Sequence, residues 1–365
     1  MLEWGNKSLC MFNKLFGLFS QDIGIDLGTA NTLVWVKNKG IVIREPSIVA
    51  LHKKTKELIA IGTEAKKMLG KTPANIITVR PLREGIIADF DATAAMIRYY
   101  LKDIHEVGKV PMAFIHPKVV IGIPSAVTEV QRRAVWEAAL SAGAREAYLI
   151  EEPMAAAIGA GVSVFQPSGI MIVDIGGGTT EIAVISLGGI VVNRSLKVAG
   201  DKMDEAILHY VRLRHGLLLG DKTTEEVKIK IGSAYENKKI KKTDGEDNVA
   251  IVRGRDLETG LPKSVRLTEA EVREALAPVL AQIIEEISDV LNEAPPELTA
   301  DILEHGILVT GGGALLPGID KLIMDRTHIP VVLADDPLTT VVRGTGKVLE
   351  DAALLNRVKV TGGLQ

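Results

Sequence analysis

The sequence has one cysteine, Cys10, so the chain cannot form an internal disulfide. A lone thiol of this kind fits a reducing compartment. No apolar run approaches the roughly 20 residues that a membrane-spanning helix needs. Neither sign of charge is in large excess, because 43 basic and 46 acidic residues give a net charge of −3. Such a balance provides no overall basic field for nucleic acid or for strong attraction to anionic lipid.

The length and composition are those of an ordinary globular protein. A chain of 365 residues is long for one hydrophobic core, so two domains are expected. Apolar residues make up 47% of the chain and charged residues 24%, a balance that argues against disorder.

Two glycine turns of the same kind stand far apart in the chain, at 26–31 (DLGTAN) and 174–180 (DIGGGTT). Each lies between two apolar runs of β type. A glycine at the tip of such a hairpin lets backbone N–H groups approach an anion, and the threonine hydroxyl adds a donor. Asp26 and Asp174, at the strand ends, can hold a divalent cation through water, since Mg²⁺ dehydrates reluctantly. The repetition indicates two related halves that bind one triphosphate between them.

A single Asp-x-Gly-Thr turn is weak evidence, because aspartate and glycine are common in plain hairpins. A third glycine-rich strand end at Gly311–Gly313 strengthens the phosphate-binding interpretation. None of these three segments ends in Gly-Lys-Ser/Thr, as a P-loop would. None follows the Gly-x-Gly-x-x-Gly pattern either, so a dinucleotide site is not indicated.

Two acidic segments allow both a structural and a functional interpretation. Glu151-Glu152-Pro153 suits a helix start, where proline and acids are favoured. Alternatively, Glu152 orients a water for attack on a γ-phosphate, with Thr179 helping to place it. The helical segment Thr224–Lys228 carries either a surface ion pair or a hydrogen-bonding face for ribose and adenine. Its spacing alone does not decide between them.

The amino-terminal segment is rich in phenylalanine. Phe12, Leu15, Phe16 and Phe19 recur at helical spacing on one face. The segment is either a helix packed on its own domain or an interfacial membrane anchor, and the exposed aromatic residues favour the anchor. Many linked copies would bind lipid far better than one.

A second apolar segment, Met112–Phe114, is expected in a loop. A small local packing contact is the simpler interpretation of its side chains. The alternative is a second membrane contact made by Met112 and Phe114 beside the amino-terminal segment.

The order of elements is three strands followed by helices and strands, twice over, which predicts an α/β protein built by duplication. Capping signals place Asp91 at the start of one helix, Thr128 at another and Thr268, with Glu271, at a third. The helices are expected at about 64–69, 91–104, 128–142, 201–215, 223–235 and 268–292.

At this point the chain resembles the MreB family, bacterial actin-like proteins that determine cell shape. The resemblance runs from about Met11 over nearly the whole chain. Its motifs are 26–31 (DLGTAN), 152–159 (EPMAAAIG), 174–181 (DIGGGTTE), 200–207 (GDKMDEAI) and 310–316 (TGGGALL).

The resemblance implies an α/β actin-like fold, with two ribonuclease-H-like domains and smaller inserted subdomains around a nucleotide cleft. Residues 1–20 would be the amphipathic membrane-binding segment. Domain I would span 21–155, completed by 337–356, with its smaller subdomain at about 42–84. Domain II would span 156–336, with its smaller subdomain at about 202–265.

The resemblance also assigns roles to residues around ATP and Mg²⁺. Asp26 and Asp174 would hold Mg²⁺ through water, while Glu152 and Thr179 would position the hydrolytic water. The nucleotide contacts would come from Thr29, Ala30, Asn31, Gly177, Gly178, Thr179, Glu225, Glu226, Val227, Lys228, Gly312, Gly313, Ala314 and Leu315.

Members of this family polymerise on ATP into paired antiparallel protofilaments on the inner face of the cytoplasmic membrane. They organise wall-elongation proteins, among them the transmembrane protein RodZ. The resemblance therefore implies an ATPase whose hydrolysis is coupled to polymerisation. The helix at 128–142 would face the sister protofilament, and no nucleic acid is implied as a partner.

Three other functions stay open at this point. A small-molecule kinase of the same superfamily would need a catalytic aspartate and a sugar pocket, and no clear candidate stands out. A chaperone-type ATPase would need a peptide-binding region, yet only about 50 residues follow Gly313. A plasmid-segregating actin relative gives no reason for the phenylalanine-rich start.

Overall fold

The computed structural model describes residues 21–106, 116–236 and 248–360. The chain divides into two compact units. Unit 1 contains the described residues up to Ser163 together with those from Thr339, and unit 2 is Val164–Leu338. Each unit has its own hydrophobic core.

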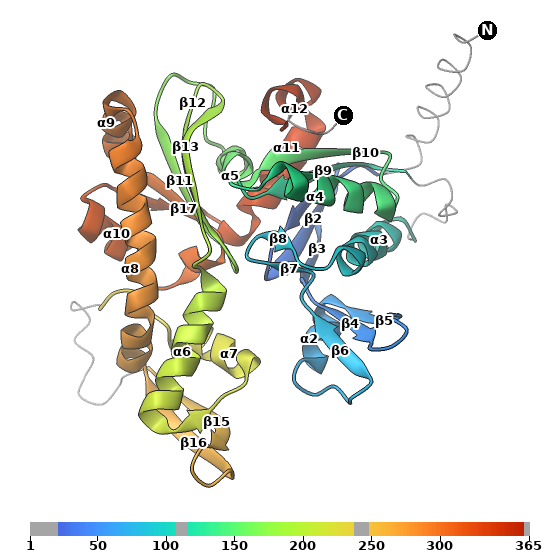
Figure 1. Ribbon diagram of the computed structural model, residues 1–365. Coiled ribbons are helices and arrows are strands. Elements are labelled where there is room, and N and C mark those ends of the chain that lie inside the picture. The colour runs from blue at the N-terminus through green and yellow to red at the C-terminus, as the bar shows by residue number, and fades with distance from the viewer. Residues whose placement is uncertain (1–20, 107–115, 237–247, 361–365) are drawn as a thin grey trace. The chain divides into compact units, whose positions relative to one another are not determined.

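Unit 1 is built on a mixed five-stranded sheet in the order β10-β9-β1-β2-β3 (Figure 1). The first three strands in sequence form an antiparallel meander, and β9 and β10 run parallel to β1. Val, Ile and Leu side chains fill β1 and β9, as expected for strands covered on both faces. The strands are β1 (Ile23–Leu27), β2 (Asn31–Val36), β3 (Gly40–Pro46), β9 (Lys118–Ile123) and β10 (Glu146–Glu151).

The helices of unit 1 pack on this sheet and on one another. The helices α5 and α11 pack especially closely, because glycines lie at their crossing. The chain leaves unit 1 just after α5 and re-enters it at α11. The helices are α3 (Phe90–Glu106), α4 (Glu129–Ala142), α5 (Glu152–Ala160), α11 (Thr340–Glu350) and α12 (Ala352–Val358).

A smaller sheet, in the order β5-β4-β6, is inserted after β3 and has a small core of its own with α2. A two-stranded ribbon follows it in the chain and leads into α3. These elements are β4 (Val49–His52), β5 (Leu58–Ile61), α2 (Gly62–Met68), β6 (Ile76–Val79), β7 (Leu82–Arg83) and β8 (Ile86–Ile87).

Unit 2 repeats the sheet of unit 1. Its order is β13-β12-β11-β17-β18, again a three-stranded antiparallel meander extended by two parallel strands. The duplication expected from the order of elements is thus confirmed. The strands are β11 (Ile170–Ile175), β12 (Thr180–Ser186), β13 (Gly189–Leu196), β17 (Ile307–Thr310) and β18 (Val331–Leu333).

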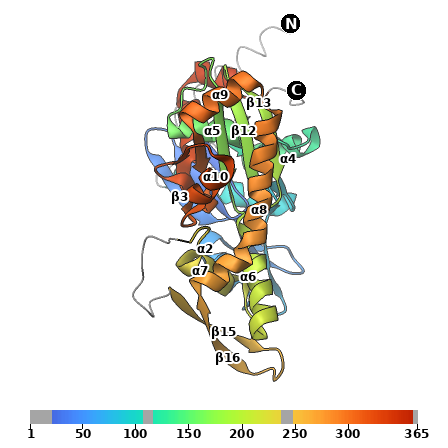
Figure 2. The same cartoon turned by 90° about the vertical axis from the view of Figure 1, so that its left-hand side faces the viewer.

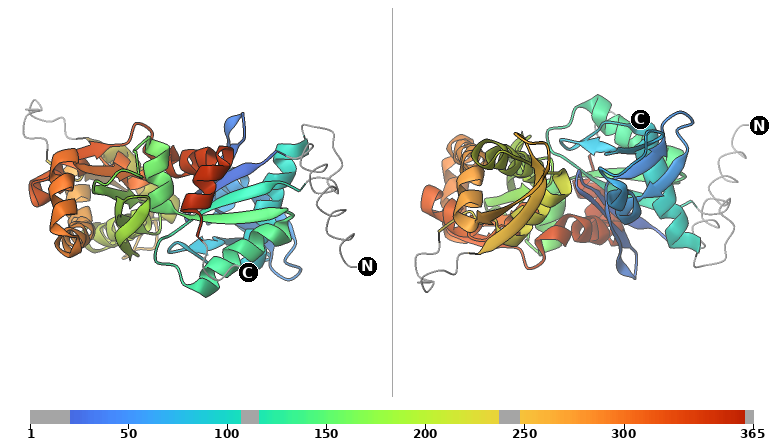
Figure 3. Two further views of the ribbon diagram at one scale, coloured as in Figure 1. Left: turned by 90° about the horizontal axis from the view of Figure 1, so that it is seen from above. Right: turned by 90° about the horizontal axis from the view of Figure 1, so that it is seen from below.

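Long helices cover this second sheet, and α8 packs across β12 and β13 (Figure 2). A small sheet in the order β14-β15-β16 lies against α7 (Figure 3, right). The elements are α6 (Gly200–His215), β14 (Leu217–Leu218), α7 (Asp221–Ile231), β15 (Val249–Asp256), β16 (Pro262–Thr268), α8 (Glu269–Glu293), α9 (Pro296–His305), η2 (Gly312–Leu315), α10 (Ile319–Thr327) and η3 (Pro337–Thr339).

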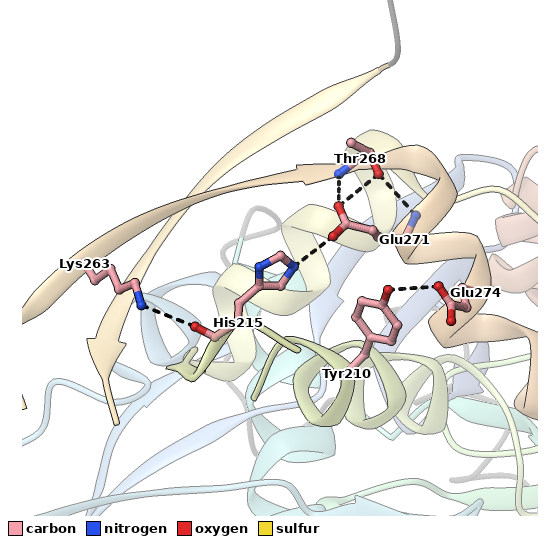
Figure 4. Close-up of polar contacts among 6 residues, drawn as sticks. All are labelled: Tyr210, His215, Lys263, Thr268, Glu271 and Glu274. Carbon is pink, nitrogen blue, oxygen red and sulfur yellow. Dashed lines mark hydrogen bonds and ion pairs between the residues drawn. The ribbon is translucent and has the colours of Figure 1, made fainter. Parts of the chain in front are cut away.

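A polar cluster ties the end of α6 to the first turn of α8 (Figure 4). The His215 Nε2 lies 2.9 Å from the Glu271 carboxylate, which also accepts the Thr268 N–H at 2.9 Å. Thr268 Oγ1 accepts the Glu271 N–H in return, so the predicted capping box is confirmed. One turn further along α8, Tyr210 donates its hydroxyl to Glu274 at 2.9 Å.

Most predicted helices lie within two residues of the observed ones at their starts. The cap at Thr128 is confirmed, with a full capping box through Gln131. The cap at Asp91 is wrong: α3 begins at Phe90, and the Asp89 carboxylate accepts the Ala92 N–H at 3.0 Å. Among the described residues, every helix is too short or too polar to cross a bilayer.

Candidate functional site

The two glycine turns, 26–31 and 174–180, are called the first and second phosphate turns, after the ligand expected from the sequence. The first joins β1 to β2 in unit 1 and has a fixed backbone. A Cβ on Gly28 would lie 2.7 Å from the Asn31 carbonyl oxygen, so glycine is required there. The Gly28 carbonyl accepts the Ser47 hydroxyl at 2.6 Å, and the Ala30 carbonyl accepts the Ser47 N–H at 3.0 Å. These bonds hold two carbonyl groups of the turn toward β3–β4. Because the peptide is trans, the N–H groups that follow them point the other way.

Thr29 in this turn is buried, and its hydroxyl oxygen accepts the Gly85 N–H at 3.1 Å. A hydroxyl that accepts in this way still has a proton to donate. Ala30 is half-buried and Asn31 is exposed. The three residues predicted to contact phosphate therefore lie on one short turn, with Thr29 held from the β7–β8 ribbon.

Asp26 and Glu152 are brought together at one end of the unit 1 sheet. Asp26 pairs in register with Gly122 of β9. A Cβ on Gly122 would lie 3.5 Å from the Glu152 Cγ, at the first residue of α5. Two acids separated by 126 positions in the sequence thus flank the same glycine.

Burial raises the pKa of the Asp26 carboxyl to about 7. A nearby divalent cation favours the charged form of such a group, so Asp26 fits a Mg²⁺ site. Within the described ranges, His, Cys, Asp and Glu side chains form no cluster of three that could hold a metal. Mg²⁺ usually takes one or two carboxylates and completes its shell with waters and phosphates, so the expected water-mediated site does not require such a cluster.

The second phosphate turn joins β11 to β12 in unit 2. The Gly176 N–H donates to the Thr179 carbonyl at 2.8 Å and closes the turn. The Gly176 and Gly177 carbonyls accept the N–H groups of Gly200 and Asp201, the first two residues of α6, at 3.2 and 2.7 Å. Their opposite N–H groups, on Gly177 and Gly178, therefore point away from α6.

The third glycine segment closes over the end of β11. A Cβ on Gly311 would overlap the Asp174 carboxylate, and one on Gly313 would overlap the Ile175 side chain. Asp174 is only 7% exposed and pairs in register with Thr310 of β17. The phosphate turn and the glycine-rich strand end of unit 2 are thus one continuous structure around Asp174.

The residues of α7 that were predicted to contact the nucleoside lie on different faces of the helix. Val227 is buried in the core of unit 2, and Glu226 is exposed, 3.8 Å from Lys222. Glu225 and Lys228 lie half-buried on another side of the helix. In the segment 312–315, Ala314 is buried and Leu315 is 55% exposed.

The end of α7 and the glycine segment meet, since a Cβ on Gly232 would lie 3.1 Å from Leu316. The Ala234 N–H also donates to the Pro317 carbonyl at 2.8 Å. The nucleoside-binding candidates on 225–228 and 312–315 are therefore carried by two elements that contact each other. The membrane candidates Phe12, Leu15, Phe16, Phe19, Met112 and Phe114 lie outside the described residues.

Sequence reasoning missed three contributors to these turns. Ser47 and Gly85 hold the first turn, and Asp204 lies 3.0 Å from the Lys228 ammonium. Asp204 stands within the 200–207 motif, which marked it as part of a signature without assigning it a role.

Comparison with known proteins finds relatives that are similar to this chain in sequence and in structure. MreB of Escherichia coli K12 is 48% identical over 346 residues, which are 93% of this chain and 96% of that protein. A crystal structure of MreB5 of Spiroplasma citri bound to ADP superposes with a TM-score of 0.85 at 38% identity, covering 92% of this chain and 98% of that one. The same protein bound to AMPPNP gives 0.84 at 39% identity, with the same coverage of both chains.

The MamK double helical filament matches with a TM-score of 0.73 at 22% identity, over 91% of this chain and 99% of that one, which supports the fold alone. The MreB/Mbl protein family matches residues 20–357, the span that holds both phosphate turns, α7 and the glycine segment. Since the family model spans most of the chain and the relatives are similar over nearly their whole length, this chain belongs to the MreB/Mbl family and has an actin-like fold.

Proposed function

We propose that this protein is an ATP-dependent, filament-forming actin homologue that works on the inner face of the cytoplasmic membrane. It hydrolyses ATP with Mg²⁺ in step with polymerisation, organises cell-wall elongation and maintains rod shape. The proposal extends to this chain what the name of the E. coli relative states, cell-shape determination, and what the S. citri structures contain, ADP and AMPPNP.

The observation that carries the proposal is that the two phosphate turns are held in the same way. In each, carbonyl groups are held by neighbouring elements, so that the following N–H groups are turned outward. In each, an aspartate stands at the end of the preceding strand. Fixed N–H donors suit phosphate oxygens, and the carboxylates suit the Mg²⁺ that accompanies them. Both turns are proposed to serve one ATP.

Hydrolysis by such a site needs positioning and charge stabilisation more than covalent chemistry. Glu152 is proposed to orient the attacking water, with Thr179 of the second turn. Polymerisation would align these groups, which couples turnover to assembly. Magnesium, when bound, would neutralise charge on the phosphates, held through water by Asp26 and Asp174.

The membrane part of the proposal is supported by where the two candidate segments join unit 1. The Gln21 N–H, just after segment 1–20, donates to His105 Nε2 at 3.0 Å, and α3 ends one residue later, before 107–115. On the other side of 107–115, the Lys118 N–H donates to the Asp22 carboxylate at 2.9 Å. The described residues that flank the two segments thus contact one another, and we propose that both segments contact one lipid surface.

Self-association is proposed to give paired antiparallel protofilaments, with α4 facing the sister protofilament. The exposed face of α4 includes Val130, which is 78% exposed. RodZ and wall-elongation proteins are proposed as partners, and the protein would be peripheral on the membrane.

Electron microscopy and phosphate release on lipid test the function directly. Purified protein with Mg²⁺ and ATP on vesicles should form membrane-bound paired filaments and release phosphate without any added acceptor. Calorimetry should show nucleotide uptake that depends on Mg²⁺. Well-folded protein that takes up no nucleotide would overturn the proposal, and phosphate transfer only to an added sugar would indicate a kinase instead.

A further inference from the structure

The ammonium of Lys228 is engaged within the protein, at the first turn of α6. Its Nζ donates to the Gly200 carbonyl at 2.8 Å and lies 3.0 Å from Asp204 Oδ1. The two charged side chains are only 17% and 21% exposed. An ion pair this shielded is screened less by salt than a surface pair. The contact therefore ties α7 to the amino-terminal turn of α6.

The same turn of α6 holds the second phosphate turn. The N–H groups of Gly200 and Asp201, at the start of the helix, donate to the Gly176 and Gly177 carbonyls. This fixes the peptide planes whose other side carries the Gly177 and Gly178 N–H groups. Gly200 lies against both partners here, because a Cβ would lie 3.3 Å from the Gly176 carbonyl oxygen and 3.4 Å from the Lys228 Nζ.

We propose, building on the proposed function, that Asp204 is a positioning residue for nucleotide binding. Its ion pair with Lys228 holds α7, which carries the nucleoside-binding candidates, against the start of α6. The start of α6 in turn holds the second phosphate turn. The two parts of unit 2 that meet the nucleotide are then held in one fixed relation. Such preorganisation raises affinity because less order has to be created on binding.

The charges around Asp204 make this lock sensitive to pH. Lys228 and Glu225 face it from α7, and Asp201 lies on its own helix. Burial raises the pKa of Asp204, which Lys228 lowers and the two acids raise further, to a final value of about 6. Asp204 is thus ionised and paired at pH 7.5 and mostly neutral at pH 5.

The test compares Asp204→Asn with Glu205→Gln, a neighbouring acid of α6 that pairs with Lys202 at the surface at 2.7 Å. The affinity of each variant and of the wild type for Mg²⁺-AMPPNP is measured by calorimetry at pH 7.5 and pH 5. Because the ligand itself titrates, the variants are compared at each pH. At pH 7.5 Asp204→Asn should bind about tenfold more weakly than Glu205→Gln, within the range typical of an interaction coupled to a binding site. At pH 5 the two should bind nearly alike.

A second pair of variants separates positioning from loss of structure. Lys228→Met should weaken binding at least as much as Asp204→Asn, and the double variant should be no weaker than Lys228→Met, since both act through one contact. Equal affinity of Asp204→Asn and Glu205→Gln at pH 7.5, or fully additive losses, would overturn the proposal. If Asp204→Asn does not fold, Lys228→Met must show the loss alone. Wild type that binds no AMPPNP at all would instead refute the proposed function.

Discussion

Gly159 of α5 lies so close to α11 that a methyl group on its Cα would overlap the Thr340 carbonyl oxygen. The contact is reciprocal, because a Cβ on Gly344 of α11 would overlap the Ala155 carbonyl of α5. The two helices thus interlock backbone to backbone. They are also the helices at which the chain leaves and re-enters unit 1.

Gly159→Ala and Gly344→Ala are therefore expected to destabilise unit 1. Each adds a methyl where backbone atoms cannot yield, which should cost about 3 kcal/mol or more. Thermal unfolding measured by circular dichroism checks this. Gly189→Ala is the control, since a Cβ there would lie 3.9 Å from the Ser186 carbonyl oxygen, an ordinary van der Waals distance. Variants at 159 and 344 that melt like the control would show that the helices can separate.

Glu152→Ala should slow phosphate release while leaving nucleotide binding intact. A group that activates a water contributes on the order of 10²-fold to 10⁴-fold in rate. Glu151→Ala is the matched control, because Glu151 precedes the helix and makes no side-chain cap with it. The measurement is phosphate release per filament together with AMPPNP affinity. Unchanged turnover per filament in Glu152→Ala would rule out the role given to this carboxylate.

His105 predicts a loss of stability in mild acid. Its Nδ1–H donates to the Leu101 carbonyl at 2.7 Å and its Nε2 accepts the Gln21 N–H, so the bonded form is the neutral ring. Burial lowers the pKa of His105, and Lys39 lowers it further against the opposing effect of the Leu101 carbonyl. The stabilisation is complete above the ordinary histidine pKa and is lost as the pH falls through the lower, folded-state pKa.

Chemical unfolding at several pH values checks this for His105→Ala, with the exposed His209→Ala as control. His105→Ala should cost about 1–3 kcal/mol at pH 7.5, because the Gln21 N–H loses its partner. Its free energy of unfolding should also decline less between pH 7 and pH 5 than that of the control. Parallel declines would mean that His105 titrates without cost in the folded protein.

Local signals in the sequence predicted much of this structure, and the failures have physical causes. The capping boxes at Thr128 and Thr268 involve residues three apart, so a short window contains the whole interaction. At α3 two aspartates stand near the helix start, and either can cap it. The Pro81 carbonyl, just before the β7–β8 ribbon, accepts the Asp89 N–H at 3.1 Å and so places Asp89 as the cap.

The candidate site also combines features that a short sequence window shows with contacts that only the folded chain makes. The phosphate turns are local, and their glycines identify them. The run 225–228 mixes different faces of α7, because successive helical residues are rotated by about 100°. Val227 consequently enters the core while Lys228 turns to α6. The Lys228–Asp204 contact joins two helices, and Thr29 with Gly85 joins two loops, so pattern reasoning over short windows could not find either.

Glu271→Ala should loosen the junction between α6 and α8 (Figure 4). Burial acts to raise the pKa of Glu271, but hydrogen bonds from Thr268 and His215 outweigh it and hold the pKa below its usual value. Losing the capping box should cost about 1 kcal/mol, and the wild-type stabilisation should disappear only as the pH falls through this depressed pKa. Unfolding of Glu271→Ala and of Glu285→Ala, an exposed residue of the same helix, checks it. Equal stability of the two at pH 7 would show that the box is redundant.

The joint substitution Phe12→Ser with Phe16→Ser should release filaments from lipid without preventing assembly. Each phenylalanine can contribute about 1.5–3 kcal/mol of gross burial, which linked monomers add together. Vesicle pelleting measures the bound fraction, with Phe90→Ser, an exposed aromatic of unit 1, as control. Since the net charge is only −3, binding should change little when salt is raised, because apolar insertion rather than charge drives it. If salt releases the wild type while the double variant still pellets, the attachment is electrostatic and the amino-terminal segment is not the anchor.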